Sequence, residues 1–250
     1  MTASWVLLRG LTRERRHWGS FVDTFKVAIG DAQVIALDLP GNGELHEMTS
    51  PLTVAGMADY CRAELARRGI APPYNLVAMS LGAMVSVAWA ARHPQEIARC
   101  VLINTSMRPF SPFHHRLRPA NYLALLKVAF MGRRARECEA TILRVTSSLA
   151  NGHADVLPAW VSYRQEFPVS PRNALRQLIA AVRFRAPARK PAARLLVLTS
   201  QQDALVDTRC SQALARAWQV AIAIHPSAGH DLPLDDGLWV AQQVRDWLNH

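Results

Sequence analysis

Cysteine is scarce in this sequence, and its cysteines are widely separated. Cys61, Cys100, Cys138 and Cys210 are the four cysteines in 250 residues. A small disulfide-stabilised fold needs a denser cysteine framework, and a structural metal site usually draws on closely spaced ligand pairs. Reduced thiols in a chain of this size are typical of a cytoplasmic protein. The sequence therefore predicts buried free thiols and a cytoplasmic location, and we expect no metal and no cofactor.

Long apolar runs are missing as well. No run approaches the roughly 18 residues that a membrane-spanning helix requires. The apolar start, Trp5 to Leu8, is short, and neither a basic segment nor a cleavage site accompanies it, so it does not resemble a signal peptide. We expect no membrane span and no signal peptide.

The sequence also lacks internal repeats and low-complexity tails. Half of its residues are hydrophobic, and 250 residues are enough to bury one sizeable α/β core. We therefore predict a single domain over residues 1–250 that carries one insertion.

Acidic residues are few in one part of the chain. From Ser106 to Lys190 there are 15 lysines and arginines against 4 acidic residues, whereas the rest of the chain holds 14 against 15. This segment alone accounts for the net charge of +10. A neutral core with a basic insertion is unusual for a nucleic-acid binder, so we expect no nucleic-acid partner; DNA affinity that falls steeply with salt would contradict this. A positive insertion above a site would instead attract an anionic substrate or an acidic carrier.

Short apolar segments alternate with helical patterns towards both ends of the chain. Such alternation is typical of a mostly parallel sheet covered by helices on both faces, and it predicts an α/β fold. The expected strands are residues 4–8, 34–37, 76–79, 100–104, 195–199 and 220–225, and the expected helices between them are 15–29, 52–68, 81–93, 208–218 and 236–248.

The alternation stops after Asn104, and prolines interrupt the sequence as far as Lys190. We predict a helical lid insertion over residues 106–190, with the core formed by 1–105 and 191–250. The lid arginines have two possible roles: they attract anionic ligands, or they only keep the outer faces of the lid helices solvated. Arg133, Arg134 and Arg136 would lie on such an outer face in the second case. Four lid helices are expected: Asn121 to Met131, Arg134 to Leu149, Leu157 to Phe167 and Arg172 to Phe184.

Residues 74–83 combine a strand, a serine and the start of a helix. Ser80 lies between Ala78 and Gly82, two small residues at the positions where a sharp strand-to-helix turn requires them. Such a turn exposes the serine hydroxyl and directs the backbone N–H of Leu81 and the amino end of the helix at an oxyanion. The pattern predicts a nucleophile at Ser80.

A serine nucleophile needs a base, and the base needs a third group that orients it. Because parallel strands end at one edge of a sheet, Ser80, Asp203 and His230, each just beyond a strand, are expected to converge there. Asp207 is a rival for the acid, but Asp203 comes first after its strand, and we expect Asp207 at the start of a helix.

Other polar residues are expected to have structural roles. His225 falls inside a strand, and His114 and His115 fall inside the basic insertion, where a core or solvated role is the simpler interpretation. Asp38 is expected to be a turn residue and not a catalytic acid, because the order of residues in the sequence offers it no histidine partner.

The order serine, aspartate, histidine resembles the α/β-hydrolase fold superfamily over nearly the whole chain. Arg9-Gly10-Leu11 is similar to the family's His-Gly-x oxyanion loop, residues 38–43 to its Asp-Leu-Pro-Gly-His-Gly turn, and residues 229–235 to its histidine loop. The resemblance implies an α/β-hydrolase fold of about six strands without the family's usual first hairpin. It also implies an oxyanion hole formed by the backbone N–H groups of Leu11 and Leu81.

Two positions depart from the family pattern. Arg9 stands where the family's oxyanion loop has histidine, and Asn42 stands where its Asp-Leu-Pro-Gly-His-Gly turn has histidine. Arg9 is either a structural residue or a group that binds an anionic acyl chain, and together with Met79 it is a candidate for substrate binding.

The resemblance implies a serine hydrolase that cleaves an ester or thioester, with lactones and carbon–carbon bonds as further options. A serine at the turn argues against the aspartate-dependent dehalogenases and epoxide hydrolases of the superfamily. The size, the four-helix lid and its basic charge look most like carboxylesterases such as the pimeloyl-carrier-protein methyl ester esterases, which implies a small-molecule ester that is anionic or carrier-bound. The alternative is a catalytically weak receptor or scaffold on the same fold. The sequence leaves the oligomeric state open.

Overall fold

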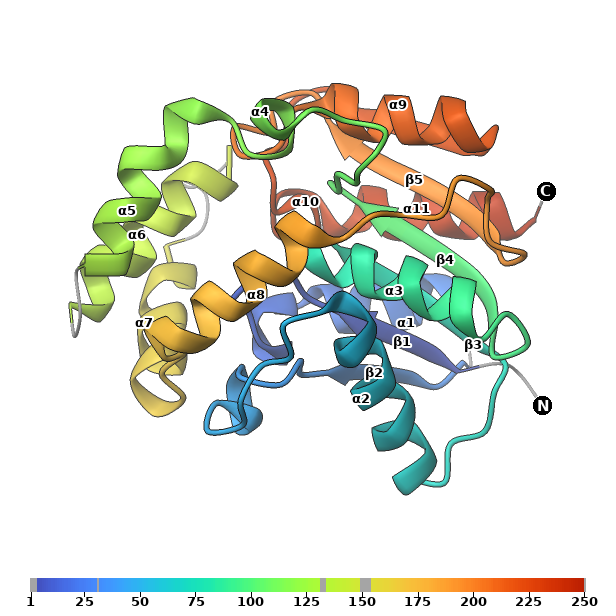
Figure 1. Cartoon of the computed structure of the whole chain (residues 1–250), viewed down its shortest axis with the longest axis horizontal. Helices are drawn as coiled ribbons and strands as arrows, with labels where there is room; N and C mark the ends of the chain where they lie inside the picture. Colours follow the sequence, from blue (N-terminus) through green and yellow to red (C-terminus); the bar gives the residue numbers. More distant parts are fainter. Residues whose placement is uncertain (1–3, 31, 131–133, 149–153, 250) are drawn as a thin grey trace.

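The computed structural model describes residues 4–30, 32–130, 134–148 and 154–249 (Figure 1). A six-stranded sheet forms its centre, and every neighbouring pair of strands is parallel, in the order β2-β1-β3-β4-β5-β6. This confirms the predicted six-stranded sheet. The strands are β1 (Trp5–Leu8), β2 (Val34–Leu37), β3 (Tyr74–Met79), β4 (Ile97–Ile103), β5 (Arg194–Ser200) and β6 (Ala221–His225).

The inner strands are apolar on both faces because helices cover the sheet from both sides. Successive residues of β1 point alternately into two core clusters: Val6 and Leu8 belong to one cluster, and Trp5 and Leu7 belong to the other. β3 and β4 alternate in the same way. A continuous apolar run in the sequence therefore builds two cores at once.

Two layers of helices enclose the sheet (Figure 1). Their packing confirms the expectation of helices on both faces. The first cluster lies beneath α2 (Val54–Arg67), α3 (Leu81–Arg92) and α9 (Thr208–Trp218), and the second beneath α1 (Phe21–Ile29) and α11 (Gly237–Leu248).

The prediction of one helix over residues 15–29 is wrong in its first part. Arg15–Trp18 forms a separate 3-10 turn, η1, and α1 begins only at Phe21. Gly19 separates the two with φ of 51°, a left-handed backbone angle that a helix cannot contain. α2 likewise begins after its predicted start, because Thr53 Oγ1 caps it by accepting the backbone N–H of Gly56.

The segment between β4 and β5 is helical, as predicted. Met131 and Leu149, the predicted ends of two of its helices, lie outside the described residues. The helices α5, α6 and α7 lie at the side of the molecule opposite both chain termini (Figure 1). The helices are α4 (Phe113–Arg116), α5 (Tyr122–Phe130), α6 (Ala135–Thr146), α7 (Val156–Glu166) and α8 (Pro171–Arg183), with η3 (Pro119–Asn121) before α5.

The last lid helix turns polar side chains inward. Asn173 and Gln177 of α8 are buried, whereas Leu175 and Val182 are 57% and 56% exposed. The two amides bind loops of the core rather than apolar neighbours. Hydrogen bonds therefore anchor α8 to the core, and its leucine stripe faces outward.

Candidate active site

Ser80 occupies a strained turn between β3 and α3. Its φ is 53° and its ψ is −114°, angles that cost about 1–3 kcal/mol for a residue other than glycine. Its backbone N–H donates to the carbonyl of Ile103 on the neighbouring strand, at 2.9 Å. Gly82 makes the turn possible, because a Cβ at that position would lie 2.4 Å from the carbonyl oxygen of Leu8. The predicted need for a small residue after the serine thus has a steric cause, and the side chain of Ser80 stays partly exposed.

The loop that follows β1 packs against this serine. A Cβ on Gly10 would lie 3.2 Å from the Cβ of Ser80 and 3.7 Å from its Oγ. The backbone of Gly10, which precedes Leu11, therefore runs directly beside the serine side chain. On the other side, helix α3 begins at Leu81, so the backbone N–H groups of its first turn, which have no partner within the helix, lie next to the serine.

His230 and Asp203 form a buried hydrogen bond. His230 Nδ1 lies 2.7 Å from Asp203 Oδ2, and both side chains are nearly inaccessible to solvent. The second carboxylate oxygen of Asp203 accepts the backbone N–H groups of Leu205 and Val206, each at 2.8 Å. Because the ionised carboxylate only accepts, the proton of this pair is assigned to His230 Nδ1. Asp203 is thus held by its own loop and in turn orients the histidine.

The rival acid Asp207 serves a different purpose. It is the N-cap residue of α9 and accepts the backbone N–H of Arg209 at 2.9 Å. The hydrogen-bonded side chain of Arg209, with help from Arg118, holds the pKa of Asp207 well below its usual range. The prediction that Asp207 starts a helix is confirmed.

Asn104, directly after β4, braces the histidine loop. Its side-chain N–H₂ donates to the carbonyl oxygens of Gly229 and His230, at 3.1 and 2.8 Å, and its Oδ1 accepts the backbone N–H of Ser200. Asn104 is a residue of this site that was not predicted from the sequence. A polar residue directly after a buried strand was the available signal, because such a residue lies at the edge where the other strand ends meet.

The end of lid helix α6 also supports the histidine loop. Asp235 accepts hydrogen bonds from Ser147 and Ser148 and from the backbone N–H of Gly229. A Cβ on Gly229 would lie 2.8 Å from backbone atoms of this lid segment, so only glycine fits before the histidine. The lid therefore helps to place His230.

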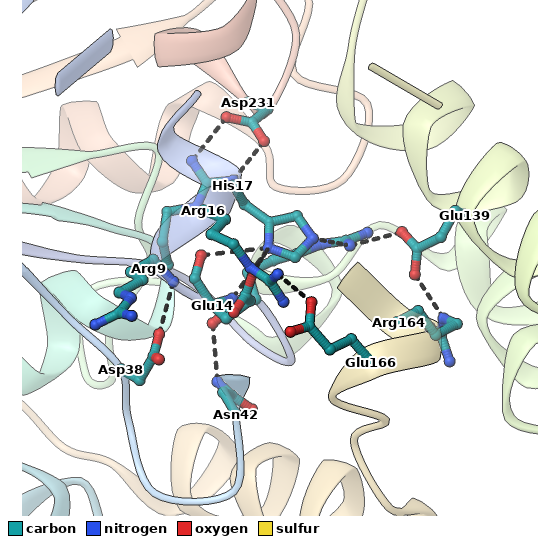
Figure 2. Close-up of polar contacts among 12 residues, drawn as sticks. Arg9, Glu14, Arg16, His17, Asp38, Asn42, Glu139, Arg164, Glu166 and Asp231 are labelled. Atoms are coloured by element: carbon teal, nitrogen blue, oxygen red, sulfur yellow. Dashed lines mark hydrogen bonds and ion pairs between the residues drawn. The ribbon is translucent and has the colours of Figure 1, made fainter. Parts of the chain in front are cut away.

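Arg9 binds the residue that follows the histidine. It donates Nη1 to Asp231 Oδ1 at 3.0 Å and Nη2 to Oδ2 at 2.5 Å (Figure 2). Its guanidinium also lies 4.9 Å from the ring centre of Trp18. Both charged side chains are buried. Of the two roles considered for Arg9, this geometry favours the structural one. Met79, the other candidate for substrate binding, is buried in the second core cluster.

A second group of buried charges joins the core to the lid. Arg13 donates to Glu139 of α6 at 2.6 Å, and Arg164 of α7 donates to the other carboxylate oxygen, also at 2.6 Å (Figure 2). Burial by itself would raise the pKa of Glu139, but the charges of the two arginines outweigh it and lower the pKa. Burial, reinforced by the charge of Arg13, lowers the pKa of His17 well below its usual value. His17 is therefore neutral in the folded protein.

The loop after β2, residues 38–43, is called the second loop, and it is held in place by Asp38 and Asn42 rather than by a histidine. Asp38 accepts the backbone N–H of Arg15 at 2.6 Å and holds the start of η1. Asn42, which stands at the family's histidine position, donates to the carbonyl of Arg13 and accepts from Gln177 of α8. His225 is also structural, since its Nδ1 accepts backbone N–H groups of the following loop.

Within the described ranges, no three or more histidine, cysteine, aspartate or glutamate side chains are grouped as a metal site would require. The same residues contain no helix with the length and hydropathy of a membrane span. A hollow of about 420 Å³ lies near Arg62, Tyr74 and Glu96, at the start of β3 and thus at the opposite end of that strand from Ser80.

Comparison with known proteins gives the family. A family model described as the alpha/beta hydrolase family matches residues 5–243. The chain belongs to this family. It is also similar to the biotin biosynthesis bifunctional protein BioHC of Teredinibacter turnerae, with 33% identity over 102 residues, which are 40% of this chain and 17% of that protein.

Solved structures of the same fold are similar over the full chain. An enol-lactonase from Burkholderia xenovorans LB400 has a TM-score of 0.81 at 20% identity, covering 100% of this chain and 93% of its own. A thermophilic esterase from Thermogutta terrifontis has a TM-score of 0.74 at 21% identity, covering 100% of this chain and 90% of its own. At such identities the likeness establishes the alpha/beta hydrolase fold alone.

Proposed function

We propose that this protein is a serine hydrolase that cleaves a carboxylic ester or thioester through an acyl-enzyme intermediate. The observation that carries the proposal is the 2.7 Å hydrogen bond between His230 and Asp203, on the same edge of the sheet as the strained and partly exposed Ser80. Membership of the alpha/beta hydrolase family supports it.

In this mechanism Ser80 Oγ attacks the carbonyl carbon of the ester. His230 Nε2 removes the serine proton and then delivers it to the leaving alcohol or thiol. Asp203 holds the imidazole in the required tautomer and stabilises the imidazolium. Water then attacks the acyl-enzyme with the help of the same histidine, and the acid and free Ser80 are released.

The negative oxygen of the tetrahedral intermediate needs donors that are already in place. We assign this role to the backbone N–H groups of Leu11 and Leu81, because Gly10 packs against Ser80 and α3 begins directly after it. Loss of one such donor in a serine hydrolase typically lowers kcat by about 10²–10³-fold.

A narrower proposal concerns the substrate. The excess of 15 basic over 4 acidic residues between Ser106 and Lys190 favours an anionic or carrier-bound acyl ester. The partial likeness to a protein named for biotin biosynthesis agrees with the resemblance to pimeloyl-carrier-protein methyl ester esterases. Some of the lid arginines bind groups of the protein itself and are not free to attract a substrate: Arg164 binds Glu139, and Arg116 binds backbone carbonyls of α8. The proposed attraction therefore depends on exposed arginines such as Arg134 and Arg136; Arg133 lies outside the described residues.

A catalytically weak receptor or scaffold with the same triad is the alternative. The two are separated by mixing the protein with an excess of a p-nitrophenyl ester and with a fluorophosphonate probe. A hydrolase releases p-nitrophenol in many turnovers and is labelled at Ser80, and Ser80→Ala abolishes both. Stoichiometric or no release from the wild-type protein over a series of acyl chain lengths and thioesters would favour the receptor.

A further inference from the structure

A buried ion pair joins the two loops that carry the proposed chemistry. Arg9 follows β1 and Asp231 lies in the loop after β6, and three strands separate β1 from β6 in the sheet. The two side chains make two parallel hydrogen bonds, at 3.0 and 2.5 Å, and each side chain is only 2% exposed (Figure 2). The pair therefore connects strand ends that the hydrogen bonds of the sheet do not connect directly.

Each partner is next to a group of the proposed mechanism. Arg9 is bonded to Gly10, whose backbone packs against Ser80, and Asp231 is bonded to His230. A displacement of either charged residue would move one of these backbones relative to the other. The separation between the serine and the histidine thus depends on how firmly the pair is held.

The geometry of the pair suits this task. A planar guanidinium bound at two points resists both translation and rotation of its partner, whereas the ammonium group of lysine binds as a single point charge. Burial of the two charges carries a desolvation cost that offsets most of their attraction, so apolar residues of similar size often give equal stability. What such residues cannot supply is the fixed two-point contact.

We propose that Arg9 and Asp231 are positioning residues that set the location of the histidine loop relative to the oxyanion loop. This inference rests on the proposed serine hydrolase function. Other contacts hold the same loops, since Trp18 lies against Arg9 and the backbone N–H of Asp231 donates to the carbonyl of Thr146 at 2.6 Å. The protein can therefore stay folded when the pair is replaced.

The experiment separates positioning from stability. Arg9→Met, Asp231→Leu and the double variant are compared with wild type by urea unfolding, by kcat and KM for an activated ester, and by the low-field proton resonance of the hydrogen bond between His230 Nδ1 and Asp203. Each single variant leaves one buried charge without a partner and is expected to lose both stability and activity. The apolar double variant is expected to recover most of the stability but to stay about 10²-fold below wild type in kcat, with a smaller change in KM. Its low-field resonance is expected to be broadened or lost.

Two further variants make the test specific. Arg9→Lys keeps the charge but not the two-point contact, and it is expected to remain slow. Arg62→Gln removes an arginine that pairs with Glu96 at the start of β3 and is expected to behave as wild type. A double variant that recovers kcat together with stability, or an Arg9→Lys variant with wild-type kcat, overturns the proposal.

Failure of the proposed function would look different. If wild type neither turns over esters nor reacts with a fluorophosphonate, the serine hydrolase mechanism is wrong, and the resonance still reports on the pair. An unchanged resonance in the folded double variant then overturns the positioning role, whereas a broadened or missing one supports it.

Discussion

The side chain of Gln177 on lid helix α8 accepts a hydrogen bond from the backbone N–H of Thr12 at 2.8 Å. Thr12 has φ of 55°, a left-handed angle that a β-branched residue rarely adopts. The same amide donates to Asn42 and to Ser50, and Gln177 is fully buried. Gln177 thus joins the loop after β1, which runs beside Ser80, to the loop after β2, which contains Asn42. The helical insertion between β4 and β5 is therefore part of the framework that holds the loop beside Ser80.

Replacement of Gln177 by leucine should lower stability and activity together. The variant leaves the N–H of Thr12 and the Oδ1 of Asn42 without this partner, at about 1–3 kcal/mol for each group that water does not reach. Ser50 Oγ loses one hydrogen bond and keeps the one to the carbonyl of Pro40. We expect the free energy of unfolding in urea to fall by about 2 kcal/mol or more. Labelling of Ser80 by a fluorophosphonate should slow as well, because the strained turn at Thr12 is released.

The control for this variant lies one residue further along the same helix. Leu178 is 40% exposed, so Leu178→Gln should change stability by less than about 0.5 kcal/mol and leave labelling unaffected. A Gln177→Leu protein with wild-type stability and labelling would show that the amide does not hold the loop.

The proposed triad predicts a strong and shared loss of activity. Ser80→Ala, His230→Ala and Asp203→Asn should each lower kcat for an ester by about 10³-fold or more, because these groups act as a unit. Asp207→Asn is the matched control: asparagine can still cap the helix by accepting the backbone N–H of Arg209, and the change does not touch His230. The assignment of the acid is wrong if Asp203→Asn stays active while Asp207→Asn does not.

The parts of the site that could be predicted from the sequence follow from the order of the strands. Once β3, β5 and β6 are recognised as parallel, Ser80, Asp203 and His230 must emerge at the same edge of the sheet. The choice of Asp203 over Asp207 rests on distance from a strand end, and the helix cap found at Asp207 has the same local origin. Helix caps and the order of the strands can both be recognised from short stretches of sequence.

The contacts between distant loops could not be predicted in this way. Arg9 meets Asp231 across 222 positions of the chain, and Gln177 meets Thr12 across 165. No periodicity or spacing encodes such partners. For α8 the pattern is even misleading, because an apolar stripe through Leu175 normally predicts the buried face, yet here the polar face is buried. Partners of buried amides and charges become visible only in three dimensions.

Acid should destabilise the protein through His17. Burial lowers the pKa of His17 in the folded state, whereas the unfolded chain takes up a proton near pH 6.5. Below this pH the unfolded state binds the additional proton, so the free energy of unfolding falls as pH decreases, by up to about 1.4 kcal/mol per pH unit for this one group. Urea unfolding of wild type and His17→Gln between pH 7.5 and 5 measures the effect. The variant should be less stable at neutral pH but show a shallower loss on acidification, and parallel curves would exclude His17 as a source.

The lid charge should matter for anionic substrates and little for neutral ones. Arg134, directly before α6, has a side chain that is 71% exposed, and Arg136 in the first turn of α6 is also exposed. Their field acts through solvent, so it should weaken as the Debye length falls from about 10 Å at 0.1 M salt to about 3 Å at 1 M. Arg134→Glu/Arg136→Glu changes the local charge by four units, and it should lower kcat/KM for an anionic or carrier-bound ester at low salt by several-fold.

Three comparisons show whether this is steering. A matched neutral ester should respond weakly to the substitution and to salt, and the loss for the anionic ester should shrink at 1 M salt as screening removes the attraction. Arg67→Glu/Arg68→Glu makes the same change of charge at the end of α2, on residues that pair with Glu64, and it should affect both substrates alike. If the lid and the α2 variants give the same result, or if neutral and anionic esters respond equally to the lid substitution, the lid arginines only solvate their helices. The proposal of an anionic or carrier-bound substrate would then lose the charge argument on which it depends.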